Sequence, residues 1–453
     1  MYWKLKVSGY GKIEHAEIEV APLTLFVGDN NSGKSYLMSL LWGIQNLGTT
    51  EMMKAMDEGS AEEILAGWFK KQMAILWEQE TCIVNVGEIL DVLQFVLDKG
   101  LGLNKENLLK KIFNSTDVKI EDLRIELVNT DKVFLTFKRT SNVVDGRKDI
   151  FFMGSSAGME FRFSFEDKSH DEIENYFGKY MVKCMLVSLA TGIGTGGAED
   201  LGSHMYLPAA RTGFMLTKNI INKVGRDTAF NMGVGQREVT PFTRLINQFL
   251  DVMNELTFDS MGNVKFDNII TYLERGMAEG AIKMSTMPNR EVMYVPEGLE
   301  SGMPLRVVSA VVTELSPLIL ILKHKWNLDT LFYEEPEMCL HPQLQQKMAR
   351  VICQLVNAGL KMVITTHSDI ILQHINNMIR LPGRENVGEI CQRFGYQEAD
   401  LMKAGNVKVY QLKSGAGVRT KVEEVACGEN GFAVPTFNEA LDRIMDEAYS
   451  IQE

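Results

Sequence analysis

The sequence predicts an α/β fold, and three stretches predict it. Each is a short apolar run, as long as a buried strand, that ends in polar residues; the runs are 23–27, 328–333 and 362–364. Helical patterns follow the first two runs. Short apolar strands that alternate with helices are typical of a parallel sheet, and ligands bind at the carboxyl ends of such strands. The polar residues after the three runs are therefore the candidates for a functional site.

The first run leads into the pattern G-x-x-x-x-G-K-S from Gly28 to Ser35. Glycines allow consecutive N–H groups to point at an oxyanion, and the following helix adds its partial positive charge. Lys34 is expected to reach the β- and γ-phosphates, and the Ser35 hydroxyl to bind Mg²⁺. A chance glycine turn is the competing interpretation, and the complete pattern between a strand and a helix disfavours it. The sequence predicts a nucleoside triphosphate site with ATP and Mg²⁺ as cofactors.

The second and third runs supply candidate catalytic residues. Glu334 and Glu335 follow the second run, and we assign Glu334 to magnesium and Glu335 to the attacking water. His367 ends the third run in a Thr-Thr-His-Ser context, where it is expected to contact the γ-phosphate. The alternatives are an acidic loop without a catalytic role and a structural histidine.

Composition narrows the class of protein. The chain has 453 residues, 45% hydrophobic and 23% charged, as in ordinary globular proteins, and a net charge of −12. The surface as a whole is therefore no electrostatic match for nucleic acid. Six cysteines without a C-x-x-C pair argue against structural zinc and disulfides. We find neither a signal sequence nor an apolar run long enough to span a membrane, and expect a cytoplasmic protein.

The remaining stretches are assigned in chain order. Residues 2–8 and 13–20 are predicted strands, 50–115 a helical insertion with a Met-rich stripe (Met52, Met53, Met56), and 117–165 an antiparallel sheet with a turn at Asp145–Gly146. Helices are predicted over about 171–191 and, as an arm, over about 212–275, and short strands at 281–284 and 292–295. The C-terminal part, 386–453, is predicted to hold a strand at 407–412 and an acidic amphipathic helix with a capping box of Thr436 and Glu439.

A local excess of basic residues lies within 211–244. It consists of Arg211, Lys218, Lys223, Arg226, Arg237 and Arg244. The stretch is either a phosphate-contacting arm for nucleic acid or a solvated helix face, and the pattern alone leaves both open.

Two motifs resemble a known family. Phe332 to Pro342 reads Phe-Tyr-Glu-Glu-Pro-Glu-Met-Cys-Leu-His-Pro, similar to the E-E-P-E-x-x-L-H-P form of OLD-like and AAA15/AAA21 ATPases. Tyr206 to Arg211 also resembles a strand of that group. The resemblance implies an ABC-type P-loop ATPase, similar to RecF and Rad50 heads, with an antiparallel β subdomain and helical insertions. Residues 1–385 would form its core and 386–453 a C-terminal subdomain.

The resemblance also implies particular residue roles. In such ATPases two heads sandwich two ATP molecules, and the signature of each head completes the other's site. Here the degenerate signature would be Leu299 to Met303, with Ser301 and Gly302 opening a helix towards the partner's γ-phosphate. The phosphate loop would supply the nucleotide-binding residues Gly28, Asn30, Asn31, Ser32, Gly33, Lys34, Ser35 and Tyr36. Glu334 stands where the family more often has Asp, and no Q-loop glutamine is assigned.

Departures from the family shape the functional hypothesis. The stretch between Arg211 and the signature is too short for an SMC or Rad50 arm, and no Toprim nuclease segment is recognised after His367. The chain therefore resembles stand-alone ATPase subunits of PARIS- or Septu-type anti-phage systems, whose nuclease is a separate chain. We expect a homodimer or higher oligomer that switches a separate effector and has no nuclease activity of its own. A RecF-like DNA-repair clamp and a slow-hydrolysing scaffold are the alternatives.

Overall fold

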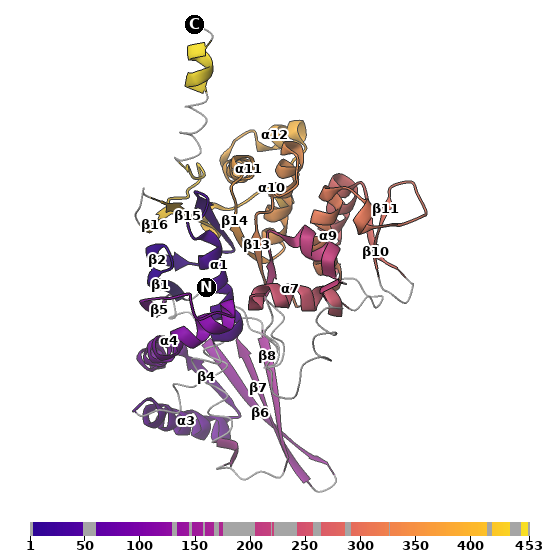
Figure 1. Ribbon diagram of the computed structural model, residues 1–453. Helices are drawn as coiled ribbons and strands as arrows, with labels where there is room; N and C mark the ends of the chain where they lie inside the picture. The colour runs from indigo at the N-terminus through magenta and orange to yellow at the C-terminus, as the bar shows by residue number, and fades with distance from the viewer. Residues whose placement is uncertain are drawn as a thin grey trace, which may run out of the picture. The chain divides into compact units, whose positions relative to one another are not determined.

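The computed structural model divides the chain into two compact units. Unit 1 is Met1–Val20 with Leu40–Ser203, and unit 2 is Ala21–Ser39 with His204–Glu453. The structure describes residues 3–48, 60–128, 134–144, 147–156, 159–166, 172–174, 204–218, 220–221, 242–256, 264–285, 291–325, 327–414, 419–434 and 445–451. Figure 1 labels the elements along the ribbon.

Unit 1 begins with an antiparallel arrangement of three strands. β1 (Trp3–Tyr10) pairs with β2 (Ile13–Glu19) on one side and with β5 (Asp122–Leu127) on the other. Alternate residues of β1 are buried, as a strand with one face on a core requires. The long helix α4 (Leu90–Phe113) packs against β5. The first two predicted strands are confirmed, whereas the strand near residue 125 belongs to this group and not to the predicted separate sheet.

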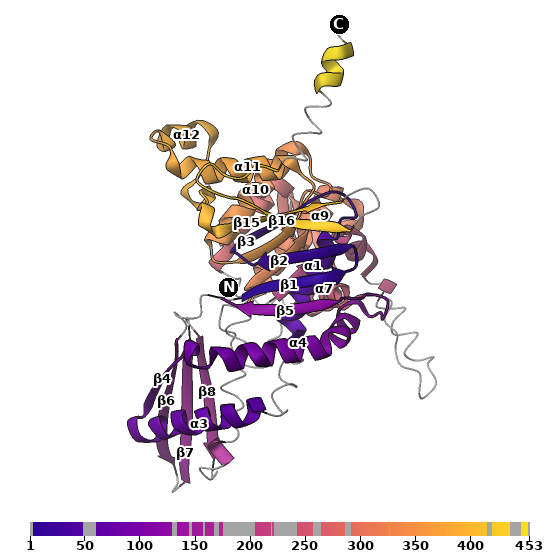
Figure 2. The same cartoon turned by 90° about the vertical axis from the view of Figure 1, so that its left-hand side faces the viewer.

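A second sheet of unit 1 is antiparallel, in the order β4-β6-β7-β8. Its strands are β4 (Thr81–Asn85), β6 (Phe134–Val144), β7 (Arg147–Ser156) and β8 (Met159–Glu166), and α3 (Ser60–Gln79) lies across β4 and β6 (Figure 2). The prediction of a purely helical stretch over 50–115 was wrong at β4, which adds to the edge of this sheet. Met52, Met53, Met56 and the Asp145–Gly146 turn lie outside the described residues.

Unit 2 contains a parallel sheet in the order β15-β3-β14-β13-β9. The strands are β3 (Leu23–Gly28), β9 (His204–Leu207), β13 (Thr330–Glu334), β14 (Lys361–Thr365) and β15 (Val407–Lys413), and β16 (Thr420–Val425) joins β15 antiparallel. Every residue of β3, β9 and β13 is buried, because helices cover a parallel sheet. The predicted strand at 407–412 therefore lies beside β3 in the core, and the predicted division at residue 385 falls inside unit 2.

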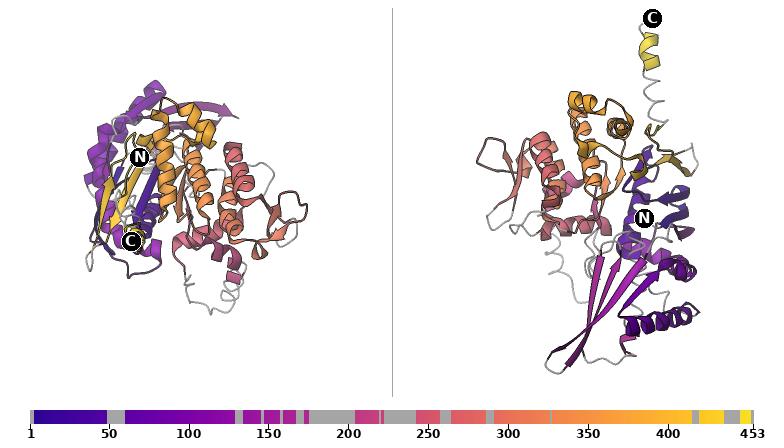
Figure 3. Two further views of the ribbon diagram at one scale, coloured as in Figure 1. Left: turned by 90° about the horizontal axis from the view of Figure 1, so that it is seen from above. Right: turned by 180° about the vertical axis from the view of Figure 1, so that it is seen from behind.

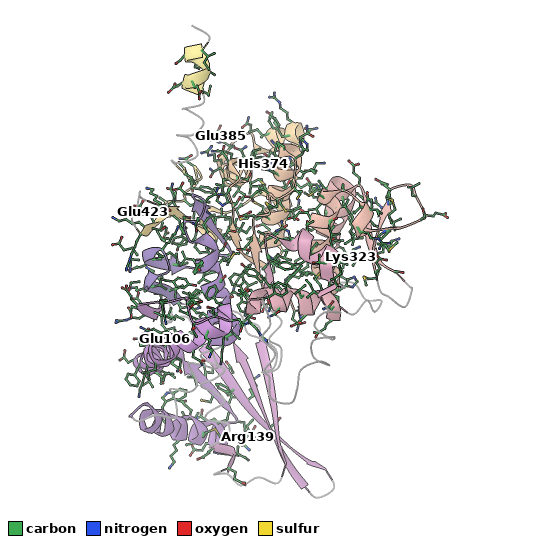
Figure 4. The ribbon with its side chains drawn as sticks, viewed as in Figure 1. Glu106, Arg139, Lys323, His374, Glu385 and Glu423 are labelled. Atoms are coloured by element: carbon green, nitrogen blue, oxygen red, sulfur yellow. The ribbon has the colours of Figure 1, made fainter. Side chains whose placement is uncertain are left out.

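Helices of unit 2 pack on this sheet around one apolar core. They are α7 (Arg244–Glu255), α8 (Asp267–Leu273), α9 (Ala310–His324), α10 (Pro342–Asn357) and α11 (Asp369–Arg380). The helix α12 (Val387–Phe394) has no buried residue and contributes none to that core. A ribbon of β10 (Gly280–Met284), β11 (Val292–Pro296) and β12 (Met303–Pro304) lies beyond α9 (Figures 1 and 3). Lys323, labelled in Figure 4, ties the end of α9 to β10 by donating to Ile282 O at 2.9 Å.

Short helical segments complete the described fold. The helix α1 (Lys34–Gly43) continues into the π-helix η1 (Ile44–Gly48), and the others are η3 (Val86–Ile89), η5 (Val264–Phe266), η6 (Glu274–Ala278), η7 (Leu305–Val307), η8 (Leu381–Gly383), η9 (Glu398–Asp400) and η10 (Ala404–Asn406). In the described part of the chain no helix is both long and apolar enough to cross a membrane. Thr436 and Glu439 of the predicted capping box, and nearly all of 171–191, lie outside the described residues.

Candidate functional site

The loop from Gly28 to Lys34 has a backbone that only certain residues adopt without strain. Gly28, Asn31 and Gly33 have φ of 130°, 58° and 103°. A Cβ atom at Gly28 would lie 2.2 Å from Leu412 O of the neighbouring strand β15. Gly28 is therefore required both by its conformation and by the close approach of another strand. The loop opens directly into α1, as the sequence predicts for an anion-binding loop.

Lys34 begins α1 and turns back over this loop. Its Nζ donates to Gly28 O at 3.0 Å and to Asp29 O at 2.6 Å. Burial lowers the pKa of Lys34 to about 8, and the carboxylates of Glu335, Asp29 and Glu337 oppose that shift. The amine of the loop therefore shares one environment with acids that follow β13. By contrast, the side chains of Asn30, Ser35 and Tyr36 are exposed.

The end of β13 presents the two predicted carboxylates differently. Glu334 is buried, and its Oε2 accepts from Ala209 N at 3.1 Å. Glu335 is partly exposed and has φ of 42°, which is uncommon for a residue with a side chain. Its N–H donates to Thr365 O of β14 at 2.9 Å. A backbone held in this conformation is a feature that concentrates at functional sites.

His367 follows β14 and lies next to Glu335. Its Nε2 is 3.9 Å from Glu335 Oε1. Burial, followed by the charge of Lys34, lowers the pKa of His367, which favours the neutral imidazole. The structure thus brings together Lys34, Glu335 and His367 from three stretches that are far apart in the sequence.

Glu337, for which the sequence predicts no role, binds the segment that carries His367. Its Oε1 accepts from His367 N at 2.6 Å, and its Oε2 accepts from the Thr366 hydroxyl at 2.9 Å. Burial raises the pKa of Glu337, and the hydrogen bonds from His367 and Thr366 counter that shift. The third acid of the E-E-P-E motif is therefore the one residue that could have been singled out in advance, since it shares the motif with two candidates.

Arg211 lies next to the carboxyl end of β13 and is completely buried. It donates from Nη1 to Glu334 O at 2.7 Å and from Nη2 to Glu335 O at 3.0 Å. It also pairs with the buried Glu314 of α9, and its guanidinium lies 4.7 Å from the ring centre of Tyr333. Arg211 is thus a structural neighbour of the candidate catalytic acids and has no exposure to a polyanion.

A second basic residue of 211–244 is also engaged within the protein, whereas Arg244, the first residue of α7, is exposed. Lys218 Nζ donates to Met253 O at 2.9 Å, and burial lowers the pKa of Lys218. Neither Arg211 nor Lys218 is therefore free to contact phosphates. Lys223, Arg226 and Arg237 lie outside the described residues.

Ser301 and Gly302 do not open a helix, contrary to the expectation for the signature. Ser301 lies in the turn before β12, and the 3₁₀ turn η7 comes next. The helix α9 begins only at Ala310, and the exposed Ser309 is its N-cap, with Oγ accepting from Val312 N at 3.4 Å. The shift arises because a two-residue strand pairs with β11 before the helix begins.

The residues fit a bound magnesium ion by their chemistry. Mg²⁺ prefers oxygen ligands from hydroxyls, carboxylates, phosphates and water. Ser35 and Glu334 offer a hydroxyl and a carboxylate, whereas the described residues contain no cluster of three His, Cys, Asp or Glu side chains that would bind a metal without the nucleotide. Such a site needs phosphate oxygens to be complete.

Comparisons with known proteins agree with the nucleotide-binding pattern. A family model described as AAA ATPase domain (AAA_15) matches residues 1–184 and 241–372. The comparison with curated proteins finds no match.

Solved structures of SMC heads also match, at low similarity. The SmcHead bound to the C-winged helix domain of ScpA is 13% identical, with 94% of this chain and 98% of that chain covered and a TM-score of 0.37. The SMC head domain from Thermotoga maritima is 13% identical, with 94% and 100% covered and a TM-score of 0.32. The Smc head domain with an extended coiled coil bound to the C-terminal domain of ScpA derived from Pyrococcus furiosus is 11% identical, with 99% of each chain covered and a TM-score of 0.34. TM-scores this low support no conclusion about the present chain.

Proposed function

The chain belongs to the AAA ATPase domain family (AAA_15), and on that basis we propose that it is a switch that binds and hydrolyses ATP. One observation carries the proposal: the phosphate-loop amine of Lys34, the carboxylate of Glu335 and the imidazole of His367 meet at one edge of a parallel sheet. A cation for phosphates, a base for water and a neutral donor are the groups that phosphoryl transfer to water requires.

Each residue has a role that follows from its place. Lys34 binds the β- and γ-phosphates, for which it exchanges its hydrogen bonds to Gly28 O and Asp29 O. Glu335 accepts a proton from the attacking water, and His367 donates a hydrogen bond to the γ-phosphate. The Ser35 hydroxyl and the Glu334 carboxylate would hold Mg²⁺, which neutralises charge on the phosphates.

We propose that a second copy of the chain completes the site. The N-terminus of α9 is capped by Ser309, is exposed and carries N–H groups that a helix leaves unpaired. Such an end suits the γ-phosphate of a nucleotide on another copy. We therefore favour Ser309 for the role first given to Ser301 and Gly302, which remain in the turn ahead of it.

The ATPase proposal is tested by two variants of the purified chain. Lys34→Ala should lose ATP binding, because the cation that holds two phosphates is gone. Glu335→Gln should bind ATP like the wild type and hydrolyse it at least about a hundredfold more slowly, because the shape remains and the base is lost. Turnover by Glu335→Gln at the wild-type rate would show that another group activates the water.

We further propose that the switch holds and releases a separate effector, a nuclease, in a prokaryotic anti-phage complex. The resemblance of Phe332 to Pro342 to stand-alone defence ATPases and the net charge of −12 support this over a DNA clamp. Affinity purification from the native host with and without ATP tests it, with Lys34→Ala as the control. Salt-dependent DNA binding by the chain alone would favour the RecF-like alternative, and failure to recover any partner would contradict the effector.

A further inference from the structure

Arg211 donates hydrogen bonds to the backbone of the proposed catalytic acid, Glu335, and of its neighbour Glu334. Its guanidinium donates to the carbonyl oxygens of Glu334 and Glu335, at 2.7 and 3.0 Å, and to Pro208 O at 3.0 Å. On the other side, Glu335 N is bonded to Thr365 O. Both polar groups of the Glu335 backbone are therefore fixed, although its φ of 42° is one that the residue adopts only with strain.

The same guanidinium reaches α9. Arg211 Nη2 pairs with Glu314 Oε1, and the Thr212 hydroxyl bonds to Glu314 Oε2. Glu314 is 1% exposed, and burial raises its pKa while Arg211 and Thr212 act in the opposite direction. Its one charged partner in the described residues is Arg211, so a displacement of α9 at this point cannot occur without moving the guanidinium.

Glu314 lies one and a half turns beyond Ser309 on this helix. Both residues precede Pro317, which interrupts the hydrogen bonds of this helix, and the helix is buried from Val312 to Leu322. The first turns of α9 therefore connect Ser309 to Glu314 within one uninterrupted helical segment. A nucleotide that engages the N-terminus of α9 therefore acts on Glu314, and through Arg211 on the carbonyls of Glu334 and Glu335.

We propose that Arg211 is a positioning residue that couples α9 to the carboxylate of Glu335, so that hydrolysis is fast only when a second copy occupies the helix N-terminus. The inference rests on the proposed ATPase function. Arginine is suited to this task because its planar fork donates to several acceptors at fixed angles, whereas a lysine ammonium is a single point charge. Arg211 itself has no contact with nucleotide in this scheme.

The first test separates positioning from binding and from folding. Arg211→Lys should lower kcat at least tenfold and leave the ATP dissociation constant within about twofold, since the phosphate loop is intact. Arg211→Met combined with Glu314→Gln removes both buried charges, and its melting temperature should lie well above that of Arg211→Met alone. The kcat of this double variant should stay as low as that of Arg211→Lys, because no guanidinium donates to the carbonyl oxygens of Glu334 and Glu335.

A matched control accounts for lost stability. Ile352→Ala truncates a fully buried side chain of α10 in the apolar core and should lower the melting temperature without lowering kcat at 25 °C. A kcat restored in the charge-free double variant, or lost equally in Ile352→Ala, would reduce Arg211 to a structural residue.

The second test addresses coupling. Turnover per wild-type chain should rise with chain concentration, as the composite sites form. Glu314→Gln should still associate when ATP is added, as followed by light scattering. Its turnover per chain should nevertheless stay at the rate that the variant shows at low chain concentration. A normal rise in Glu314→Gln would overturn the coupling. A wild type that does not hydrolyse ATP at all would instead contradict the proposed function, so the two failures are distinguishable.

Discussion

The depressed pKa of Lys34 predicts that ATP affinity falls as pH rises through about 8. Burial lowers the pKa of this amine from 10.5 to about 8 in the free chain. The bound phosphates favour the charged form, so the pKa of Lys34 in the complex is higher than in the free chain. Only the ammonium form binds, and the free chain loses that form above pH 8.

The size of the effect follows from the pKa. With a pKa of about 8, roughly nine tenths of the free chains carry the ammonium at pH 7 and roughly one tenth at pH 9. The ATP dissociation constant should therefore rise about tenfold between these pH values, and about half a proton should be taken up per ATP bound at pH 8. The γ-phosphate itself is fully ionised across most of this range.

Isothermal titration calorimetry of the wild type with a non-hydrolysable ATP analogue measures both quantities without turnover, and it keeps the Glu335 carboxylate that acts on the pKa of Lys34. Affinity is followed from pH 7 to 9.5, and proton uptake is obtained by comparing buffers of different ionisation enthalpy. Lys34→Arg is the control, because its guanidinium stays charged and its affinity should not change over this range. A flat wild-type affinity with no buffer dependence would refute the assignment of Lys34 to the phosphates.

Substitutions at four positions test other parts of the site. Gly28→Ala should prevent ATP binding and lower the free energy of unfolding by about 2 kcal/mol or more, because its Cβ would lie 2.2 Å from Leu412 O at a φ of 130°. Urea denaturation measures the loss of stability, and wild-type stability in this variant would contradict the close approach of Leu412. In single-turnover assays Glu335→Gln should bind ATP and cleave it at least about a hundredfold more slowly, and a normal burst of phosphate would assign the base elsewhere. Ser309→Arg should abolish ATP-dependent self-association without affecting ATP binding by the monomer, whereas Ser301→Arg should have the smaller effect; the reverse order would return the signature to 301–302.

The elements whose residues lie in one continuous pattern could be predicted from the sequence. The strand, loop and helix around Lys34 are local, because the apolar run, the glycines and the helical period follow each other within twenty residues. The same holds for β13, β14 and α10, which the structure places where the pattern predicts them. The family match to an AAA ATPase domain covers these elements.

Elements that depend on a distant partner were missed or misassigned. β4 was predicted as helix, since five residues carry too little periodicity to outweigh the helical stretches on both sides. β15 was found as a strand but placed in a separate subdomain, because nothing in residues 407–413 specifies pairing with β3. The helix start at Ala310 was displaced towards Ser301 because the strand β12 is only two residues long.

The motifs that contain Arg211 and Glu337 do not reveal that these side chains act on backbone atoms. Arg211 and Glu337 bind carbonyl and N–H groups of the strand ends, and any residue can supply such groups. A sequence pattern can select the acid or the imidazole that meets the substrate, because its chemistry is specific. It does not select the side chains that hold them, since these depend on which strands become neighbours.

The order of the strands in space explains why the three candidate groups meet as they do. In the chain β13 precedes β14, but in the sheet β14 lies between β3 and β13. His367 therefore ends the strand between the phosphate loop and Glu335, where the charge of Lys34 helps to lower its pKa and Glu335 Oε1 lies 3.9 Å away. A neutral imidazole in that place can donate from one nitrogen and accept at the other, so it can bond a phosphate oxygen on one side and a water on the other.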